Sequence, residues 1–281
     1  MIKIDNLTKE YGDFKLDISM EIKEGGVSGI VGRNGTGKST TLKAILGLIK
    51  SDGGNISILG KVPRELSPKD RQNIGVAFSD SGFSSYLTIK DIIKILKNMY
   101  ENFDEKWFVS QCGKYALPLN KKIKDFSTGM SARLRVLAAC SHEAKLLILD
   151  EPTAGLDVIA RNEILDLLRE YLAKDSGRTL LISSHISSDL EGLCDDIYML
   201  NDGRIVVHEE TDVILSSYAL LKLSEAMYEQ IDKKYILRTS KESFGYSCLT
   251  DRKDFYLENY PEIVIESGGI DELIIMMSKE A

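Results

Sequence analysis

Short apolar runs and helical patterns alternate along the chain up to about residue 208. Residues 27–31 form a short apolar run that leads into a glycine-rich loop, and residues 40–48 then follow the period of a helix. Residues 146–149 are apolar at every position, which is typical of strands covered on both faces in a parallel sheet. An amphipathic helix is predicted at residues 163–172, and further strands are predicted at residues 16–22, 55–59, 74–78, 179–182, 197–200 and 204–207. This alternation predicts an α/β fold.

A mainly helical insert is predicted at residues 82–130. Thr88 and Asp91 have the spacing of a capping box, in which two side chains close the first turn of a helix. Apolar residues at near-helical spacing follow directly: Ile92, Ile93, Ile95 and Leu96. We therefore expect a helical subdomain within the α/β unit.

The pattern changes again after residue 208. Residues 218–281 contain shorter alternating patches, with helical stretches between them, at residues 235–239, 244–249 and 263–266. Alternation over a few residues is the pattern of half-buried strands. We therefore expect a small α+β accessory domain at residues 209–281, appended to a larger α/β domain at residues 1–208.

The composition is that of an ordinary globular protein: among 281 residues, 43% are hydrophobic and 28% are charged. The formal net charge of −7 argues against a surface that binds nucleic acid, although a local basic patch remains open. No apolar run reaches the ~18 residues that cross a bilayer, and the first residues lack the layout of a signal peptide. We therefore expect a cytoplasmic protein that reaches any membrane through a partner.

The cysteines and histidines show neither a disulfide pattern nor a metal-binding pattern. The four cysteines are scattered without a C-x-x-C spacing, and the three histidines are similarly dispersed. Regular spacings are the signature of zinc sites and of disulfide frameworks. We therefore expect reduced thiols and no zinc site.

The candidate chemistry begins in the glycine-rich loop. Its sequence, Gly32-Arg33-Asn34-Gly35-Thr36-Gly37-Lys38-Ser39, fits the phosphate-binding pattern G-x-x-x-x-G-K-S/T without a mismatch. Glycines let backbone N–H groups turn toward a polyphosphate, and the helix that follows points its positive end at the anion. Lys38 can reach the β- and γ-phosphates, and Ser39 can offer its hydroxyl to Mg²⁺. We expect nucleotide contacts from Gly32, Asn34, Gly35, Thr36, Gly37, Lys38, Ser39 and Thr40.

The alternative is a glycine-rich turn that matches the pattern by accident. A strand directly before the motif and a helix directly after it argue against that alternative, because the pattern counts only in this context. The motif predicts a P-loop NTPase that binds ATP and Mg²⁺, without saying which kind of NTPase it is.

Two acidic residues follow the apolar strand at residues 146–149. Asp150 is placed to hold Mg²⁺ through water, and Glu151 can accept a proton from the attacking water. A positioned general base contributes roughly 10²–10⁴ to a rate. Many strands end in acidic residues that simply face solvent. The functional interpretation of this pair therefore depends on the P-loop upstream.

Four further segments, in their order and spacing, resemble a nucleotide-binding domain of the ATP-binding-cassette (ABC) family. Phe126-Ser127-Thr128-Gly129-Met130 is similar to the ABC signature, usually L-S-G-G-Q, and begins an apparent helix. The run from Glu151 to Asp157 resembles the end of the Walker B strand and the D-loop. Ser184-His185 resembles the switch histidine, and Tyr11 resembles the aromatic residue that stacks on adenine. The resemblance covers residues 1 to about 208.

The resemblance implies a RecA-like P-loop core with an antiparallel β subdomain and the helical insert. It also implies that two cassettes face each other head to tail, so that Ser127 and Gly129 of one chain contact the γ-phosphate held by the other. His185 would contact the γ-phosphate and the attacking water, and Asp157 would shape the dimer contact. Tyr11 would stack on adenine, a contribution of ~1–3 kcal/mol. The implied catalytic residues are Lys38, Glu151 and His185.

Three of these residues also have ordinary structural interpretations. Tyr11 can be a plain surface aromatic, His185 a structural histidine and Ser127 a helix cap. The cap is compatible with the functional role. The position of His185, after the strand that follows Walker B, favours the switch role.

The sequence departs from the family pattern in two places. In the signature, Thr128 replaces a glycine and Met130 replaces a glutamine, a form similar to that of a branch of bacterial exporter-type cassettes. In the Q-loop, where a glutamine usually follows the strand, the chain has Ser79 and Asp80. In the family, that loop normally links the nucleotide site to the membrane partner. The second departure therefore concerns the coupling between the two.

The leading hypothesis is the ATP-hydrolysing subunit of an ABC transporter, of exporter type, at the inner face of the cell membrane. ATP binding would close a dimer of cassettes, identical or different, and hydrolysis would open it to drive a transmembrane permease. A non-transport ABC ATPase acting on DNA or a soluble complex is one alternative, and such proteins usually carry coiled-coil insertions, paired cassettes or basic surfaces. A regulatory module that senses ATP without useful turnover is another. The altered Q-loop and signature keep it open, and the intact Glu151 and His185 argue against it.

Overall fold

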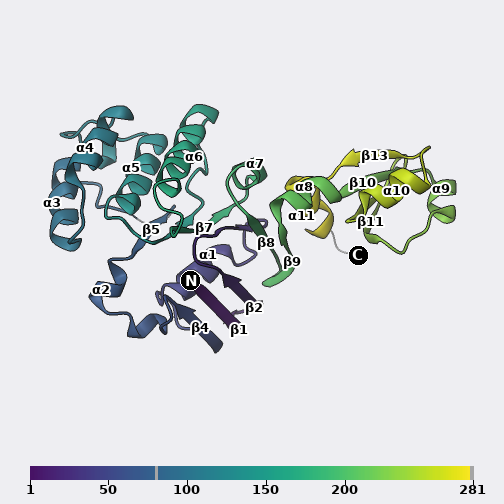
Figure 1. The fold of residues 1–281 in the computed structure, drawn as a ribbon, viewed down its shortest axis with the longest axis horizontal. Helices are drawn as coiled ribbons and strands as arrows, with labels where there is room; N and C mark the ends of the chain where they lie inside the picture. The colour runs from purple at the N-terminus through teal and green to yellow at the C-terminus, as the bar shows by residue number, and fades with distance from the viewer. Residues whose placement is uncertain (80–81, 279–281) are drawn as a thin grey trace.

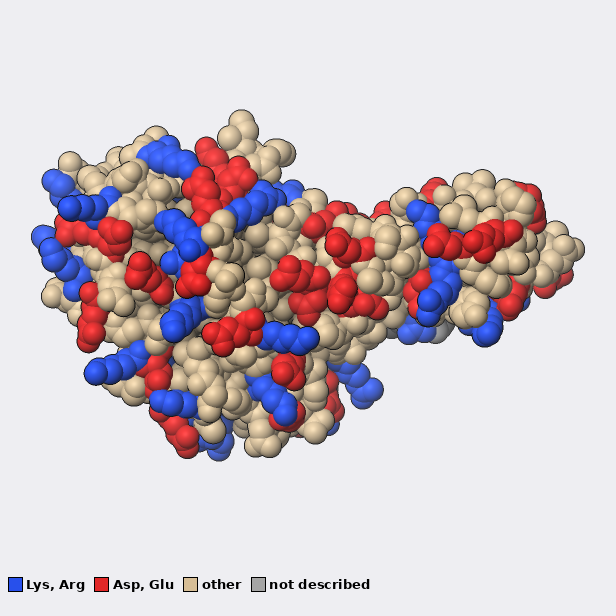
Figure 2. All heavy atoms as spheres, viewed as in Figure 1, with Lys and Arg blue, Asp and Glu red and all other residues tan. Residues whose placement is uncertain are grey.

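The structure, a computed structural model, describes residues 1–79 and 82–278. The molecule is elongated, with a larger α/β body that continues into a smaller lobe formed by the last part of the chain (Figure 1). On the face shown in Figure 2, acidic and basic side chains are interspersed over the larger body. Within the described residues, we find no helix with the length and apolar character that crossing a bilayer demands.

The larger body is built on a six-stranded sheet in the order β5-β6-β7-β3-β8-β9. The first five strands are parallel, and β9 pairs antiparallel with β8. The central strands β3, β6 and β7 are buried along their whole length, as strands with both faces covered must be. All of these strands are predicted by the sequence: β3 (Val27–Val31), β5 (Ile74–Phe78), β6 (Leu146–Asp150), β7 (Thr179–Ser184), β8 (Asp196–Asn201) and β9 (Arg204–Glu210).

An antiparallel sheet in the order β2-β1-β4 forms the expected β subdomain. It shares one hydrophobic core with a face of the central sheet and with helix α1 (Lys38–Ile45). Strand β1 is not predicted by the sequence because the register shifts between Ile4 and Leu7, so that its apolar side chains leave the period of two. The strands are β1 (Ile2–Tyr11), β2 (Phe14–Ile22) and β4 (Gly53–Ile58).

Helices of the insert and of the later chain share a second hydrophobic core with the other face of the central sheet. Thr88 and Asp91 form the expected capping box at the start of α3. Residues 82–130 hold α3, α4 and the start of α5, which continues beyond this range and packs against β5. The helices are α2 (Pro68–Arg71), α3 (Ile89–Met99), α4 (Glu105–Lys114), α5 (Thr128–Cys140), α6 (Val158–Leu172) and α7 (Ser187–Glu191), with 3₁₀ turns η1 (Pro63–Glu65) and η2 (Ile123–Asp125).

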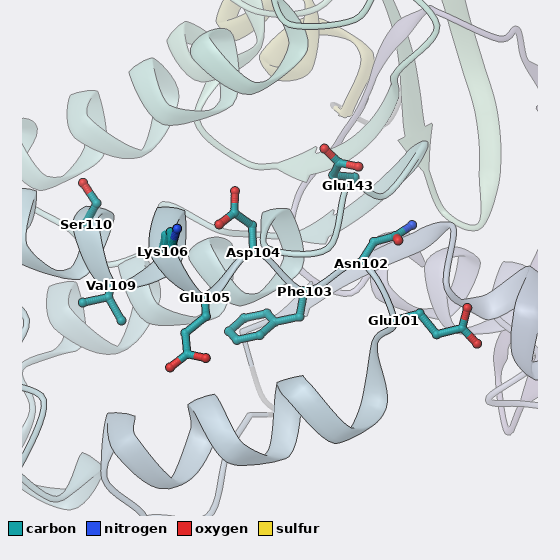
Figure 3. Close-up of a pocket in the computed structure, with 9 residues that line it drawn as sticks. All are labelled: Glu101, Asn102, Phe103, Asp104, Glu105, Lys106, Val109, Ser110 and Glu143. Carbon is teal, nitrogen blue, oxygen red and sulfur yellow. The ribbon is translucent and has the colours of Figure 1, made fainter.

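A cavity of about 1030 Å³ lies beside α4 in this helical region (Figure 3). Asp104, in its lining, caps α4 by accepting a hydrogen bond from the backbone N–H of Trp107, at 2.9 Å between N and Oδ1. Figure 3 shows the labelled side chains spread along α4 and the loop before it, with Glu143 on a separate segment, rather than converging on one point. Its lining contains no residue that the sequence motifs single out, so this cavity is separate from the candidate site.

The smaller lobe contains an antiparallel sheet in the order β11-β12-β10-β13. Strand β10 is not predicted by the sequence because it lacks alternation: Leu220 packs into the core of the larger body, and Leu221 packs into the lobe's own core. The other strands coincide with the predicted patches. The elements are α8 (Thr211–Ser217), β10 (Ala219–Leu223), α9 (Glu225–Gln230), β11 (Ile236–Glu242), β12 (Gly245–Thr250), α10 (Lys253–Asn259), β13 (Val264–Ser267) and α11 (Ile270–Ser278).

Helix α11 returns from the lobe to the larger body. Its residues Ile270, Leu273 and Met276 are buried in the core cluster of the larger body, against α7 and β8. Asn201 Nδ2, at the end of β8, donates a hydrogen bond to the carbonyl oxygen of Met277 at 3.2 Å. The lobe is thus attached to the larger body through α11 as well as through the chain that leads into β10, and the division at residue 209 stays a prediction.

Replacing Leu273 with alanine should destabilise the larger body as well as the lobe. Leu273 has 0% of its surface exposed, and removing a buried leucine side chain costs about 2–5 kcal/mol. Urea unfolding followed by circular dichroism measures the loss, with Ile275→Ala, at an exposed position of the same helix, as the matched control. A loss no larger than that of the control would show that α11 does not contribute to the core.

The thiols are core side chains rather than reactive groups. All four cysteines are free and buried. Burial raises the pKa of the Cys112 thiol to about 11 and that of Cys140 to about 12. Since the thiolate is the nucleophile and the metal ligand, these cysteines are poorly suited to either role.

Candidate nucleotide-binding and hydrolysis site

The glycine-rich loop connects β3 to α1, and two of its glycines are required by the geometry. Gly32 has a φ of 154°, and a Cβ atom there would lie 2.3 Å from the carbonyl oxygen of Leu200. Gly37, the N-cap of α1, has a φ of 109°, and a Cβ atom there would lie 2.8 Å from Leu16 Cδ1. Only glycine fits at these two positions. The glycines therefore allow the loop to pass close to Leu200 and Leu16 without a clash.

Lys38 is the first residue of α1, and its side chain folds back over the loop. Its ammonium group donates hydrogen bonds to the carbonyl oxygens of Gly32, at 2.7 Å, and Arg33, at 3.2 Å. The side chain is only 6% exposed. A buried cation held this way at the amino end of a helix adds its charge to that of the helix dipole, which together favour an anion.

A cavity of about 340 Å³ brings most of the predicted P-loop residues together. It also contains Ser79, which follows β5 at the position of the Q-loop, whereas Asp80 lies outside the described residues. Phe14, from β2, is a lining residue that sequence reasoning missed, because it belongs to an alternating strand and carries no motif. The lining residues are Phe14, Asn34, Gly35, Gly37, Lys38, Ser39, Thr40, Ser79 and Glu151.

Tyr11 lies close by in the chain but is not in that lining. It pairs with Phe14 across the turn between β1 and β2, and 49% of its surface is exposed. The Lys9 ammonium lies 5.1 Å from the centre of the Tyr11 ring. The contact of this half-exposed ring with adenine stays a prediction.

Asp150 and Glu151 stand at the carboxyl end of β6, next to β7. Asp150 is 2% exposed, and its Oδ1 accepts a hydrogen bond from Ser183 Oγ at 2.5 Å. Glu151 adopts a φ of 49°, which costs a non-glycine residue about 1–3 kcal/mol. Its backbone N–H donates to Ser183 Oγ and to the Ser183 carbonyl, both at 3.1 Å, and these bonds hold the turn.

The Glu151 carboxylate lies between Lys38 and His185. Its Oε1 is 3.2 Å from Lys38 Nζ, and its Oε2 is 2.6 Å from His185 Nδ1. The backbone N–H of His185 also donates to Oε2, at 3.2 Å. Apart from the ion pair with Lys38, the buried Oε1 accepts no hydrogen bond from the described residues. The three predicted catalytic residues therefore meet, with one carboxylate oxygen left to take a further hydrogen bond.

The signature and D-loop residues lie elsewhere in the chain's own structure. Ser127 caps α5, where its Oγ accepts a hydrogen bond from Met130 N at 3.2 Å. Asp157 caps α6 in the same way, accepting from Ala160 N at 2.8 Å. Gly129 lies in the first turn of α5, where a Cβ atom would have only ordinary contacts. The structure does not bring Ser127, Gly129 or Asp157 into the described P-loop cavity.

Comparison with known proteins identifies the family. A family model described as "ABC transporter" matches residues 16–154. The lantibiotic transport ATP-binding protein SrtF of Streptococcus pyogenes is 36% identical over 216 residues, which cover 75% of this chain and 92% of SrtF. The bacitracin transport ATP-binding protein BcrA of Bacillus licheniformis is 35% identical, over 73% of this chain and 68% of BcrA.

A solved structure agrees with these relatives. The dimeric, post-hydrolysis ATP-binding cassette MJ0796, bound to ADP and Pi, superimposes with a TM-score of 0.65 at 25% identity. The match covers 75% of this chain and 98% of that one. The match in fold therefore agrees with the sequence similarity and with the site geometry described above. The chain therefore belongs to the ABC transporter family, as one of its ATP-binding, ATP-hydrolysing subunits.

Proposed function

We propose that this chain hydrolyses ATP to drive export through a separate, membrane-embedded permease. The observation that carries the proposal is the meeting of Lys38, Glu151 and His185, with Glu151 3.2 Å from Lys38 Nζ and 2.6 Å from His185 Nδ1. A cation for the phosphates and a carboxylate to take a proton from water are the groups that this hydrolysis needs. The names of the lantibiotic and bacitracin relatives support a role in transport. The form of the signature, with Thr128 and Met130, supports export as its direction.

In the proposed reaction, the phosphates of ATP enter the P-loop and compete with Glu151 for the Lys38 ammonium. Phosphate binding thereby releases Glu151 Oε1, which has no other hydrogen bond from the described residues. This oxygen accepts the proton of the attacking water as the bond from the water oxygen to the γ-phosphorus forms. The bond between the γ-phosphorus and the oxygen that bridges it to the β-phosphate breaks in the same step, and ADP leaves with that oxygen. His185, bonded to Oε2, keeps the carboxylate directed at the cavity.

Ser39 and Asp150 would hold Mg²⁺ in this proposal. Ser39 lines the cavity, and the buried Asp150 has one oxygen bonded to Ser183, which leaves the other for a metal-bound water. Mg²⁺ usually takes one or two protein oxygens and completes its shell with water and phosphate oxygens. Bound there, it would neutralise charge on the β- and γ-phosphates. Ser79, in the same cavity, is the described candidate for the Q-loop role.

A second cassette completes the proposed site. Ser127 and Gly129 stand at the amino end of α5, whose positive dipole end suits the γ-phosphate bound by the other chain. Asp157 would shape the contact between the cassettes, and Tyr11 would stack on adenine. The dimeric cassette structure supports this arrangement. Residues 1–208 would form the catalytic cassette and residues 209–281 an accessory domain.

The test is an affinity purification of the tagged chain from its native membrane in mild detergent. We expect a multi-span membrane protein to co-purify in stoichiometric amount, with the chain recovered from the inner face of that membrane. ATP hydrolysis by the pair in liposomes, stimulated by the exported substrate, completes the test. Recovery from the soluble fraction only, alone or with a soluble complex, would overturn the transport proposal and favour a non-transport ABC ATPase.

A further inference from the structure

Asp189, in α7, is a buried carboxylate to which the reaction as described assigns no role. It is 0% exposed. Its Oδ1 pairs with Arg161 Nε from α6, and its Oδ2 accepts hydrogen bonds from Thr153 Oγ1 and from Ser184 Oγ, the latter at 3.3 Å. A buried charge is tolerated only when it is paired and hydrogen-bonded, as it is here on both oxygens.

These bonds join the two loops that carry Glu151 and His185. Thr153 belongs to the turn that begins at Glu151, and Ser184 directly precedes His185. On the other side of His185, the backbone N–H of Ile186 donates to Ser184 Oγ at 3.0 Å, and Asp189 N donates to the Ile186 carbonyl at 3.2 Å. One carboxylate therefore fixes the neighbours of His185 and the turn of Glu151 at the same time.

We propose that Asp189 is a positioning residue for hydrolysis, which sets the contact between His185 and Glu151. This inference rests on the proposed roles of those two residues. Arg161 contributes by holding the Asp189 carboxylate in place, since it also donates to Ser188 Oγ in α7. Asp189 contacts the His185 loop and the Glu151 turn but neither of the two side chains, so its effect reaches the reaction through them.

A purely structural role would give a different result. If Asp189 only joined α6 to α7, its replacement would lower the melting temperature without a specific change in the environment of the His185 imidazole. If it positions His185, its replacement must change the environment of that imidazole and slow turnover while ATP binding persists. Small displacements of catalytic groups cost up to about 100-fold in rate.

The experiment compares Asp189→Asn and Thr153→Val with wild type in the full chain. Thr153→Val removes one hydroxyl, keeps the ion pair and serves if Asp189→Asn fails to fold. Asp166→Asn is the matched control, because it breaks an exposed Arg–Asp pair between α6 residues Asp166 and Arg169. For Asp189→Asn we expect kcat to fall by about 10- to 100-fold while the KM for ATP changes by less than about threefold.

The structural readout is the ¹⁵N spectrum of histidine-labelled protein, which contains three histidines. We expect both variants to shift the His185 Nδ1 resonance, assigned with His185→Ala, and to leave those of His142 and His208 in place. An unchanged His185 resonance, or an unchanged kcat, in a folded variant would overturn the inference. Wild-type protein without Mg²⁺-dependent ATPase activity would instead overturn the proposed function itself.

Discussion

Glu151→Gln should reduce the ATP turnover of this chain by about 10²- to 10⁴-fold while leaving ATP binding nearly unchanged. The amide keeps the size of the carboxylate and can still bond to His185, whose Nδ1 lies 2.6 Å from Glu151 Oε2. It cannot take a proton from water, so only the chemical step is lost. Phosphate release measured with saturating ATP and Mg²⁺ gives the rate, and titration with a fluorescent ATP analogue gives the affinity.

The matched control for this prediction is Glu24→Gln, which neutralises an exposed glutamate. It should retain the wild-type rate. Because Glu151→Gln binds ATP without consuming it, size-exclusion chromatography with ATP should also show a longer-lived dimer than wild type. Turnover within about twofold of wild type would remove Glu151 as the general base, since a general base contributes at least about 10²-fold.

Lys38→Ala should weaken ATP binding itself, by about 10- to 100-fold, because a hydrogen bond to a charged group contributes about 1.5–3 kcal/mol. The 6% exposed ammonium is held over the P-loop by the Gly32 and Arg33 carbonyls, where phosphates would replace Glu151 as its anionic partner. Equilibrium titration with the fluorescent analogue measures the loss directly.

Lys50→Ala, at an exposed position just after α1, is the control and should bind ATP as wild type does. Both substitutions remove one positive charge. Comparing them therefore separates the effect of losing the Lys38 ammonium from the effect of changing the total charge of the chain. A dissociation constant for Lys38→Ala equal to that of the control would contradict phosphate recognition by Lys38.

The site residues that the sequence predicts are those that stand in contiguous motifs. The P-loop and the Asp150–Glu151 pair carry their own flanking strand and helix, so their place in space follows from the chain. Ser183 and Asp189 carry no such signal, because they act through partners far along the chain. Ser183, for example, reaches Asp150 because the two are paired in the register of β6 and β7. That register exists only in the folded sheet.

Other causes explain the elements that the sequence missed or misplaced. A bulge hides the alternation of β1, and burial on both sides hides that of β10. Helix α1, predicted over residues 40–48, ends at Ile45 because Gly47, with a φ of 68°, takes the left-handed conformation that terminates helices. Leu48, beyond that glycine, is 62% exposed. The glycine that ends the helix is visible in the sequence, but the apolar Leu48 after it fits the helical pattern and extended the prediction.

The return of α11 to the larger body has a consequence for how the protein is made. Domains usually fold from the amino end during synthesis, as each stretch of chain leaves the ribosome. Here Ile197 and Met199 of β8 belong to a core cluster that also contains Ile270 and Leu273. A nascent chain that carries the whole P-loop and both catalytic loops therefore still exposes apolar surface until residues 270–278 emerge. Completion of this ATPase core therefore waits for residues 270–278, and chaperones have an interval in which to bind the exposed apolar surface.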